Sequence, residues 1–378
     1  MLRFFTRKKE EKKSLLASDK SKTARFHPLK VIDVRRETSD SVSIAFEVPE
    51  DHQKDYLFLP GQYLTLRAMI NGEDVRRSYS ICSSPDSGEV RVAVKRLPDG
   101  VFSTYANDQL KPGDTIDVMT PMGNFVARCS AENEKTYVAF AAGSGITPVM
   151  SIMQSVLEKE PKSSFYLFYG NRASNSIIFK EAIEDLKDRY MDRLEVHHVL
   201  SREDQGSDLM KGRIDKGRVK AFAGRFFDLK EVNDFFVCGP EGMIHDVTEA
   251  LDELGISKEK VHYELFTPAK KPDVKEHKHS SKESEVLSQV TVILDGDETH
   301  FEISSKGKTI LDSALDAGAD VPFACKGAVC CTCRAKVLEG EVEMEMNYAL
   351  VDEEVDEGYV LTCQSHPKTK KVVVSYDE

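Results

Sequence analysis

The chain has 378 residues, of which 40% are hydrophobic and 31% are charged, and its formal net charge is -12 at pH 7. This composition is that of an ordinary globular protein with room for two or three domains, each of which buries its own core. No apolar run has the length of a membrane span or of a signal-peptide core, so we expect neither a span nor export.

Residues 1–25 are basic and polar, with nine Lys/Arg residues and three acidic ones. This segment is typical of a disordered, solvated arm. Contact with nucleic acid or anionic lipid is the alternative for a basic tail, but we expect no nucleic-acid partner.

Residues 26–130 predict an antiparallel β-barrel, because short β-branched or alternating runs recur between turns such as Pro60-Gly61. Within this region, Arg77-Ser78-Tyr79-Ser80 offers a guanidinium fork for a pyrophosphate and an aromatic face for a planar ring. Gly100-Val101-Phe102-Ser103 follows, and Ser103 is a candidate cap for a helix whose free N–H groups would hold phosphate oxygens. Each tetrapeptide alone also fits an ordinary surface strand or turn.

Residues 131–266 predict an α/β domain with a parallel sheet. A strand at 138–142 runs into Gly143-Ser144-Gly145-Ile146-Thr147-Pro148, and a helix follows. A glycine-rich turn between strand and helix is a phosphate cradle, although the full G-x-G-x-x-G motif is not present. Later strands end at Gly170-Asn171-Arg172, Ser201-Arg202 and Cys238-Gly239-Pro240. We expect all four turns at the carboxyl edge of the sheet, where ligands of such folds bind.

Residues 267–287 predict a linker, since they contain prolines, lysines and serines and almost no apolar side chains. His277 and His279 lie in this segment, and solvated side chains explain them better than a metal site does.

Residues 288–378 predict a small mixed sheet that clasps a helix, as in a β-grasp domain. Cys325, Cys330 and Cys333 follow a C-x4-C-x2-C spacing, with Cys363 far downstream, which is the plant-type [2Fe-2S] signature. A zinc site would instead favour paired C-x2-C knuckles or histidine partners. We interpret Cys331 as a small buried side chain beside the cluster rather than as a ligand.

The remaining cysteines show no disulfide-framework spacing, so we expect a reducing, cytoplasmic location. Residues 287–378 carry 18 acidic and 8 basic side chains, a net charge of -10. Two interpretations stay open for this charge: it steers a basic partner, or it serves solubility.

Together the three regions resemble the ferredoxin-NADP reductase superfamily with a fused C-terminal plant-type ferredoxin. Several segments, among them RSYSICSS from Arg77 and AAGSGITP from Ala141, look like the reductase subunits of bacterial phenylacetyl-CoA epoxidases. The resemblance implies that Arg77 binds the FAD pyrophosphate, that Tyr79 lies against the isoalloxazine ring and that Ser80 approaches flavin N5. It also implies that Gly100 and Ser103 complete the pyrophosphate site.

For the nicotinamide nucleotide, the resemblance places Cys238 beside the hydride-transfer position and Glu264-Leu265-Phe266 at the end of the nucleotide domain. The nucleotide-binding residues that it implies are Gly143, Gly145, Thr147, Pro148, Cys238, Gly239 and Pro240. Ser201 and Arg202 are added as candidates because they follow the third strand of the sheet. The implied cluster ligands are Cys325, Cys330, Cys333 and Cys363. Cys331 and the basic arm depart from the family pattern.

Hydride donation moves two electrons, whereas an iron–sulfur cluster carries one, so the flavin has to mediate between them. We therefore expect a reductase that passes electrons from NADPH through FAD and the [2Fe-2S] cluster to a multicomponent oxygenase, the diiron phenylacetyl-CoA epoxidase of aerobic phenylacetate degradation. Ser201-Arg202 suits a 2′-phosphate, but the adjacent Glu203 and Asp204 would repel it, so NADH is the alternative.

Other acceptors remain alternatives: a different diiron hydroxylase, a fatty-acid desaturase or a hybrid-cluster-type protein. A non-catalytic redox sensor is the alternative from another functional class.

Overall fold

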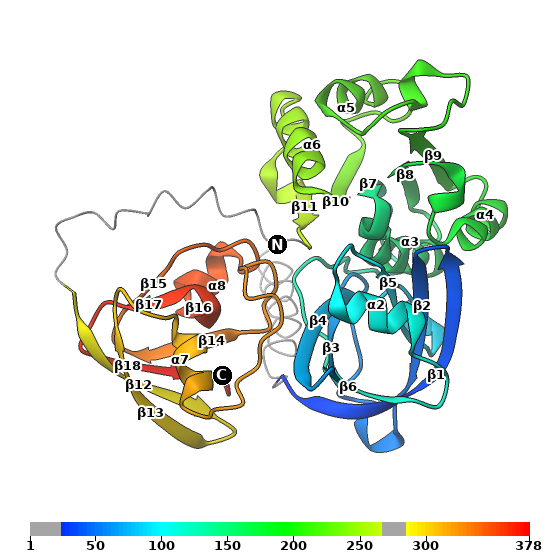
Figure 1. The fold of residues 1–378 in the computed structure, drawn as a ribbon. Helices are drawn as coiled ribbons and strands as arrows, with labels where there is room; N and C mark the ends of the chain where they lie inside the picture. The colour runs from blue at the N-terminus through cyan, green and yellow to red at the C-terminus, as the bar shows by residue number, and fades with distance from the viewer. Residues whose placement is uncertain (1–23, 267–284) are drawn as a thin grey trace. The chain divides into compact units, whose positions relative to one another are not determined.

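The computed structural model describes residues 24–266 and 285–378. The predicted arm and linker, with His277 and His279, lie almost entirely outside the described residues. The chain divides into two compact units, one of residues Pro28–Pro272 and one that contains Asp273–Glu378. Each unit is described by itself, and Figure 1 gives the element labels.

The first half of the larger unit is a six-stranded antiparallel sheet with the strand order β4-β3-β6-β1-β2-β5. Its elements are β1 (Phe26–Thr38), β2 (Ser41–Glu47), β3 (Tyr63–Ile70), β4 (Glu73–Ser80), β5 (Val90–Lys95), β6 (Thr115–Met119) and the helix α2 (Val101–Asp108). The sheet encloses a core that includes Leu66, Val92 and Phe102. β4 was not predicted as a strand, because its residues are mostly charged or polar. It pairs with β3 through a two-residue turn in which Asn71 and Gly72 both have positive φ.

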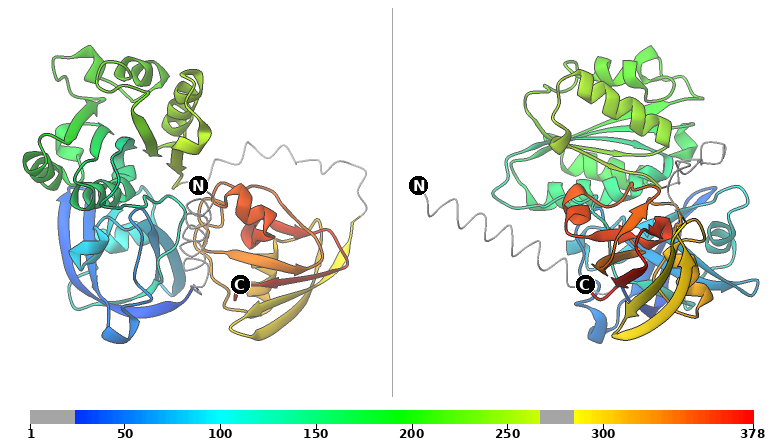
Figure 2. Two further views of the ribbon diagram at one scale, coloured as in Figure 1. Left: turned by 180° about the vertical axis from the view of Figure 1, so that it is seen from behind. Right: turned by 90° about the vertical axis from the view of Figure 1, so that its left-hand side faces the viewer.

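The second half is a five-stranded parallel sheet with the order β11-β10-β7-β8-β9. Its strands are β7 (Thr136–Ala142), β8 (Ser164–Asn171), β9 (Leu194–Leu200), β10 (Val232–Cys238) and β11 (Val261–Glu264). Its helices are α3 (Ile146–Lys159), α4 (Lys180–Arg189), α5 (Lys216–Phe222) and α6 (Glu241–Glu253). The helices cover both faces of the sheet (Figures 1 and 2). The core on the α3 side also takes in Phe125 and Cys82 of the barrel, so the two halves share buried surface.

The smaller unit is a mixed sheet with the order β13-β12-β18-β14-β16, together with the β15-β17 pair. Its elements are β12 (Leu287–Leu294), β13 (Asp297–Ser304), α7 (Ile310–Asp316), β14 (Arg334–Glu339), β15 (Val342–Met344), α8 (Asp352–Asp356), β16 (Tyr359–Leu361), β17 (Ser365–Pro367) and β18 (Lys371–Ser375). The side chain of Thr309 caps α7, whose Ile310 and Leu311 are fully buried. The predicted helix clasped by a sheet is therefore present.

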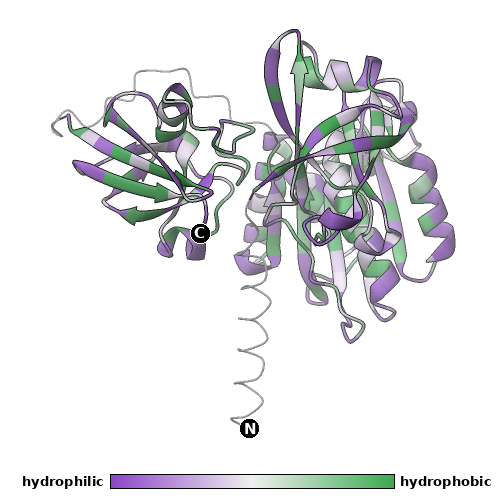
Figure 3. Ribbon diagram, turned by 90° about the horizontal axis from the view of Figure 1, so that it is seen from below, coloured by the Kyte–Doolittle hydropathy of each residue, from purple (hydrophilic) through white to green (hydrophobic). Residues whose placement is uncertain are grey.

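Hydrophobic stretches concentrate in the strands of the two units and on the helix faces that pack against them (Figure 3). None of the helices in the described ranges combines the length and apolarity that crossing a bilayer requires.

A buried carboxyl group ties together the start of the parallel sheet and the segment that leads into it. Glu160, directly after α3, is fully buried. It accepts hydrogen bonds from Tyr137 Oη at 3.0 Å, Ser163 Oγ at 2.7 Å and Asn133 Nδ2 at 2.6 Å. The backbone N–H of Ser130 donates to it at 3.2 Å. Four donors from three segments thus depend on one carboxyl group.

We predict that Glu160→Ala lowers the free energy of unfolding by about 2–4 kcal/mol, because it leaves several buried donors without an acceptor. Urea unfolding of the full chain measures the loss. Glu134→Ala is the matched control, since its side chain is 77% exposed and reaches Lys162 only at 4.0 Å, and we expect a loss of about 0.5 kcal/mol or less. Equal losses for the two variants would contradict the role of Glu160.

Candidate functional site

The expected flavin-binding residues lie at the end of β4. Because strand side chains alternate, Arg77 and Tyr79 share one face and Ser80 takes the other. The Tyr79 ring lies 5.6 Å from the ring of Phe102 on α2, at an interplanar angle of 38°. Arg77 is exposed, and its guanidinium contacts only the carbonyl oxygen of Arg76, at 2.7 Å. An aromatic face and a cation directed away from the barrel core thus lie side by side.

The helix that follows corrects one expectation. α2 begins at Val101 and its N-cap is Gly100, whose carbonyl oxygen accepts from Thr104 N. Ser103 lies inside the first turn, so it is not the cap that we predicted. Its hydroxyl donates to Gly100 O at 3.1 Å and accepts from Leu97 N at 3.1 Å, which fixes the loop before the helix. Ser103 therefore shapes the helix start, and the free N–H groups of the first turn are left to bind anions.

The barrel and the nucleotide half meet at three polar side chains. Ser80 Oγ donates to Glu264 Oε2 at 3.1 Å, and Glu264 pairs across the sheet with Cys238. Burial, and then the neighbouring Glu264, raise the pKa of the fully buried Cys238 thiol well above its usual range. Cys238 is therefore a neutral thiol at pH 7 and not a nucleophile.

Glu264 is a partly buried carboxyl at this junction. Desolvation raises its pKa to about 8, against a smaller lowering effect of the Ser80 hydroxyl. Sequence reasoning named Glu264 only as part of a terminal motif and assigned it no acid–base role. The signal that could have indicated a shifted pKa was a glutamate at the end of a strand, at a domain junction.

The predicted strand-end turns surround a cleft of about 810 Å³. The cleft is lined by Gly143, Ser201, Arg202, Gly239 and Pro240, as the sequence predicted. The remaining predicted residues, Gly145, Thr147, Pro148 and Cys238, are not among the lining residues and are buried behind them.

Close packing leaves no room for a side chain at position 145, so a glycine is required there. A Cβ there would lie 2.0 Å from the carbonyl oxygen of Cys238. Thr147 Oγ1 donates to Ser144 O at 2.9 Å and so fixes the turn after β7. These residues position the cleft wall, and Gly143, with a φ of 55°, stays open on the cleft side.

Three arginines of the cleft have no protein partner. The side chains of Arg172, Arg202 and Arg213 are exposed and make no hydrogen bond or ion pair with any described residue. In addition, the side-chain amide nitrogen of the buried Asn171, Nδ2, has no hydrogen-bond partner among the described residues. Sequence reasoning placed Asn171 and Arg172 at the carboxyl edge of the sheet but gave no binding role to them or to Arg213.

The two acids expected to repel a phosphate are engaged elsewhere. Glu203 Oε2 accepts from Ser174 N at 2.7 Å, and Asp204 accepts from Lys211 Nζ and from Gly206 N, both at 2.8 Å. Lys211 therefore offsets the charge of Asp204, whereas Glu203 keeps its negative charge and is held by a backbone N–H group.

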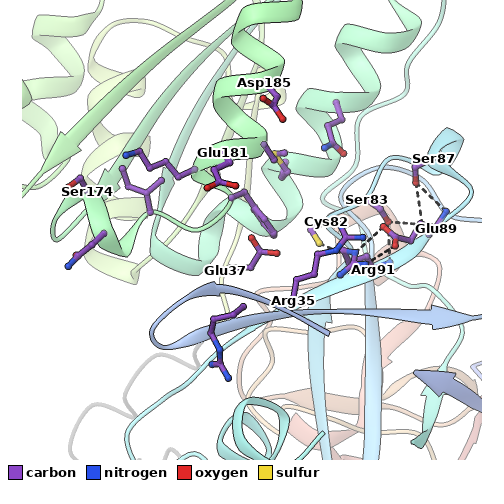
Figure 4. Close-up of a pocket in the computed structure, with 18 residues that line it drawn as sticks. Arg35, Glu37, Cys82, Ser83, Ser87, Glu89, Arg91, Ser174, Glu181 and Asp185 are labelled. Atoms are coloured by element: carbon purple, nitrogen blue, oxygen red, sulfur yellow. Dashed lines mark hydrogen bonds and ion pairs between the residues drawn. The ribbon is translucent and has the colours of Figure 1, made fainter. Parts of the chain in front are cut away.

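A second cavity, of about 710 Å³, lies between the barrel and α3 and α4 (Figure 4). Its main charged groups neutralise one another: Arg91 Nη2 lies 2.5 Å from Asp33 Oδ2 and 2.8 Å from Glu89 Oε1. Ser83 Oγ donates to the carbonyl oxygen of Glu89 at 2.7 Å. Arg36, Glu37, Glu181 and Asp185 also line this cavity, so it mixes charges of both signs.

In the smaller unit, the four predicted cysteines converge on one another. Cys330 Sγ donates to Cys325 Sγ at 3.1 Å, and the Cys333 thiol donates to Cys363. Lys326 and Ala328 both have positive φ, a left-handed conformation that turns the loop's N–H groups inward. Gly327 N donates to Cys325 Sγ at 3.3 Å. Such a nest of N–H groups suits an anionic iron–sulfur centre.

The same contacts favour the thiolate form that binds iron. The Cys330 thiol, and then N–H groups of the loop, lower the pKa of Cys325 to about 6. The Cys333 thiol and the Ala328 N–H lower the pKa of Cys363.

The sulfurs form two close pairs rather than one group. Among the described residues, no three of these sulfurs all lie within 4.8 Å of one another. A single tetrahedral zinc with 2.3 Å bonds would bring four sulfurs to about 3.8 Å from each other. Two pairs instead fit two irons. Cys331 is buried outside the pairs, and its Sγ donates to Ala349 O at 3.3 Å.

Comparison with known protein families divides the chain into three matches. Residues 28–126 match the oxidoreductase FAD-binding domain, and residues 140–249 match the oxidoreductase NAD-binding domain. Residues 292–368 match the 2Fe-2S iron-sulfur cluster binding domain. These assignments confirm the predicted cofactors at the level of the domains.

Two relatives align over nearly their whole length. The chain is 44% identical to the E component of the 1,2-phenylacetyl-CoA epoxidase of Escherichia coli (strain K12), over 93% of this chain and 98% of the relative. It is 34% identical to the ferredoxin reductase component of 3-ketosteroid-9-alpha-monooxygenase from Rhodococcus rhodochrous, over 92% and 96%.

Solved structures show the same fold. Phthalate dioxygenase reductase matches with a TM-score of 0.54 at 22% identity, over 93% of this chain and 98% of that one. An intact type IV self-sufficient cytochrome P450 monooxygenase matches with a TM-score of 0.66 at 22% identity, over 92% of this chain and 41% of that longer one. The predicted fold class, an antiparallel barrel, a parallel nucleotide sheet and a ferredoxin domain, is confirmed.

The raised pKa of Glu264 predicts a pH effect on stability. An unfolded glutamate has a pKa of about 4.3, so between about pH 4.3 and pH 8 the folded chain holds a proton that the unfolded chain has lost. Stability contributed by this group therefore falls as the pH rises through that window and levels off above it. Glu264→Gln imitates the protonated form, so its Tm should exceed that of the wild type by a margin that grows to about 3 °C by pH 8.

Thermal unfolding at pH 5, 6, 7 and 8 measures this margin. Glu47→Gln, at an exposed position, is the control and should give a margin that does not change with pH. A constant margin for Glu264→Gln would mean that Glu264 is ionised across the whole range.

Proposed function

Because the chain belongs to the ferredoxin-NADP reductase superfamily with a fused C-terminal [2Fe-2S] ferredoxin, we propose that it is the reductase component of a phenylacetyl-CoA epoxidase. The chain is an oxidoreductase with FAD-, NAD- and 2Fe-2S-binding domains. The observation that carries the choice of acceptor is the 44% identity over 98% of the E. coli epoxidase component. The 34% identity to a 3-ketosteroid monooxygenase component makes another oxygenase the second candidate.

The residues at the end of β4 would hold the flavin. Arg77 and the free N–H groups at the start of α2 suit its pyrophosphate, and Tyr79 offers a ring face. Ser80 would approach N5, across from Cys238. When bound, the flavin accepts a hydride and its two electrons leave singly through the iron–sulfur cluster. The protein's part is to bind, orient and exclude water, since the neutral Cys238 thiol adds an apolar contact without added charge.

The proposed cluster ligands are Cys325, Cys330, Cys333 and Cys363, in the two pairs described above. All eight cysteines are free of disulfides, which suits the reducing cytoplasm that we propose as the location.

We propose NADPH as the preferred nucleotide. Arg202 follows β9, Arg213 lines the same cleft, and neither has a side-chain partner among the described residues, so both guanidinium groups are available to a 2′-phosphate. Glu203, the acid next to Arg202, is bound to Ser174 N instead of facing an incoming anion. NADH lacks the 2′-phosphate and would leave these cations unused.

Replacing both arginines, as Arg202→Ala with Arg213→Ala, should raise the Michaelis constant for NADPH roughly 10- to 100-fold and leave that for NADH within about threefold. Steady-state reduction of ferricyanide measures both constants. Arg189→Ala, on the exposed side of α4, is the control and should change neither. If both nucleotides weakened equally, the two arginines would hold the shared pyrophosphate rather than the 2′-phosphate.

The function itself is tested by reconstitution. The purified full chain, loaded with FAD and with anaerobically assembled cluster, is mixed with the oxygenase component of phenylacetyl-CoA epoxidase, NADPH, O2 and phenylacetyl-CoA. We expect NADPH oxidation coupled to epoxide formation, with one NADPH consumed for each epoxide. Rapid cytochrome c reduction without epoxide formation would place the chain with another acceptor. No sustained turnover with either acceptor would favour the redox sensor.

A further inference from the structure

The smaller unit leaves a group of apolar side chains exposed beside its cysteine loop. Tyr348, Val351 and Val355 are 41%, 45% and 38% exposed. They lie within eight residues, in the segment that leads into α8 and on α8 itself. Exposed apolar side chains that occur singly are ordinary, but a local group of them marks an interaction surface.

This segment is fixed to the cysteine loop by two hydrogen bonds. Tyr348 N donates to the carbonyl oxygen of Ala328 at 3.1 Å. Cys331 Sγ donates to the carbonyl oxygen of Ala349 at 3.3 Å. Ala328 and Cys331 both lie between the first and last cysteines of the loop. Tyr348 is therefore hydrogen-bonded directly to the loop that carries three of the proposed cluster ligands. A partner that covers Tyr348 would therefore lie close to the electron source.

The exposure follows from how α8 is anchored. Leu350 and Glu354, four residues apart, take the inward side and are 7% and 8% exposed. Glu354 Oε1 lies 2.7 Å from Arg334 Nη1, and Glu354 Oε2 accepts from Val351 N at 3.2 Å. Val351, the extended N-cap residue, and Val355, on α8, are both exposed and so lie on the outer side. The fold thus fixes the helix through Glu354 and presents the two valines to solvent.

The same surface also carries acidic side chains. Asp352, Glu353 and Asp356 on α8 make no ion pair with any residue that the structure describes. Several acids elsewhere on this unit are paired with basic side chains: Glu339 with Lys371, Glu343 with Lys368, Glu345 with His366, Asp312 with Lys326 and Asp316 with Lys308. Asp297, Glu302 and Glu341 make no ion pair with a described residue either, but they lie on β13 and just before β15. The three acids of α8 are the ones beside the exposed apolar group, where they can attract a cationic partner.

We propose that Tyr348, Val351 and Val355, with the acids Asp352, Glu353 and Asp356, form the exit face of this chain, where the oxygenase component docks through an apolar centre ringed by Lys and Arg. On this face the acceptor gains the single electron that the reduced cluster loses. The proposal rests on the proposed function, because it assigns a place to that function's partner. A second copy of this chain would bring the same negative face and be repelled, and anionic lipid or nucleic acid would be repelled for the same reason.

The apolar centre is tested with Tyr348→Ser in the full, cofactor-loaded chain. Binding to the oxygenase component, followed by biolayer interferometry, should weaken at least tenfold, mainly through faster dissociation. Leu287→Ser is the matched control, since Leu287 is 64% exposed at the start of β12, and it should leave the affinity unchanged. Equal affinities for Tyr348→Ser and the wild type would overturn the apolar part of the face.

The acidic rim is tested with the double variant Asp352→Asn and Glu353→Gln. We expect slower association and a weaker dependence of the association rate on salt, with little change in dissociation. The control is Asp297→Asn with Glu302→Gln, which removes the same charge from β13, at the opposite edge of the sheet from β16 and α8. If both double variants slowed association equally, net charge and not the exit face would steer the partner.

The rate of electron transfer from NADPH to the cluster inside the chain distinguishes the remaining outcomes. Stopped-flow absorbance follows cluster reduction by NADPH without any oxygenase. Tyr348→Ser should reduce its cluster at the wild-type rate, and slower reduction would assign this surface to the chain's own flavin half and overturn the proposal. If the wild-type chain reduces its cluster but does not bind the epoxidase oxygenase component, the proposed acceptor has failed; if it binds and Tyr348→Ser binds equally well, the face has failed.

Discussion

Hydride donation requires a nicotinamide ring and a flavin ring to meet, and the meeting point that we propose is the contact of two strand ends. Ser80 ends β4, Glu264 ends β11, and 3.1 Å separates their side-chain oxygens. Further contacts hold the two halves in register: Ser151 Oγ on α3 donates to the carbonyl oxygen of Ser83 at 2.6 Å. The glycine-rich turn lies at the start of that same helix. A shift of α3 would therefore disturb the phosphate cradle and the flavin side together.

The cysteine loop has a different role. It holds the sulfurs in two pairs and shields their negative charge from solvent. Two non-glycine residues, Lys326 and Ala328, take left-handed backbone conformations. Such conformations are disfavoured for residues with a Cβ and persist where surrounding contacts enforce them. Here the enforcing contacts are the inward N–H groups and the Tyr348 N–Ala328 O bond. The loop is strained in order to direct its donors at sulfur.

Local spacing predicted much of this molecule, since the cysteine pattern and the strand-end turns depend on neighbours in the chain. Prediction failed where a pairing that residue type and spacing do not reveal decides the structure. β4 is polar and is a strand because β3 pairs with it, and Ser103 was misjudged because Gly100 already caps α2. Residue order likewise gave no sign that Ser174, 29 residues away in the sequence, donates its backbone N–H to Glu203. Composition shows which charges are present, whereas folding decides which of them stay unpaired.

Charged side chains without an ion-pair partner can provide binding specificity while the folding free energy changes little. An exposed ion pair contributes only about 0–1 kcal/mol, so leaving Arg213 or Glu353 without a partner changes the folding free energy little. Each unpaired group, however, attracts an opposite charge that arrives from solution. The three arginines of the cleft and the three acids of α8 have opposite sign and lie in different units. A small anion and a cationic protein surface can therefore be recruited to separate sites, and neither competes with the other for the same residues.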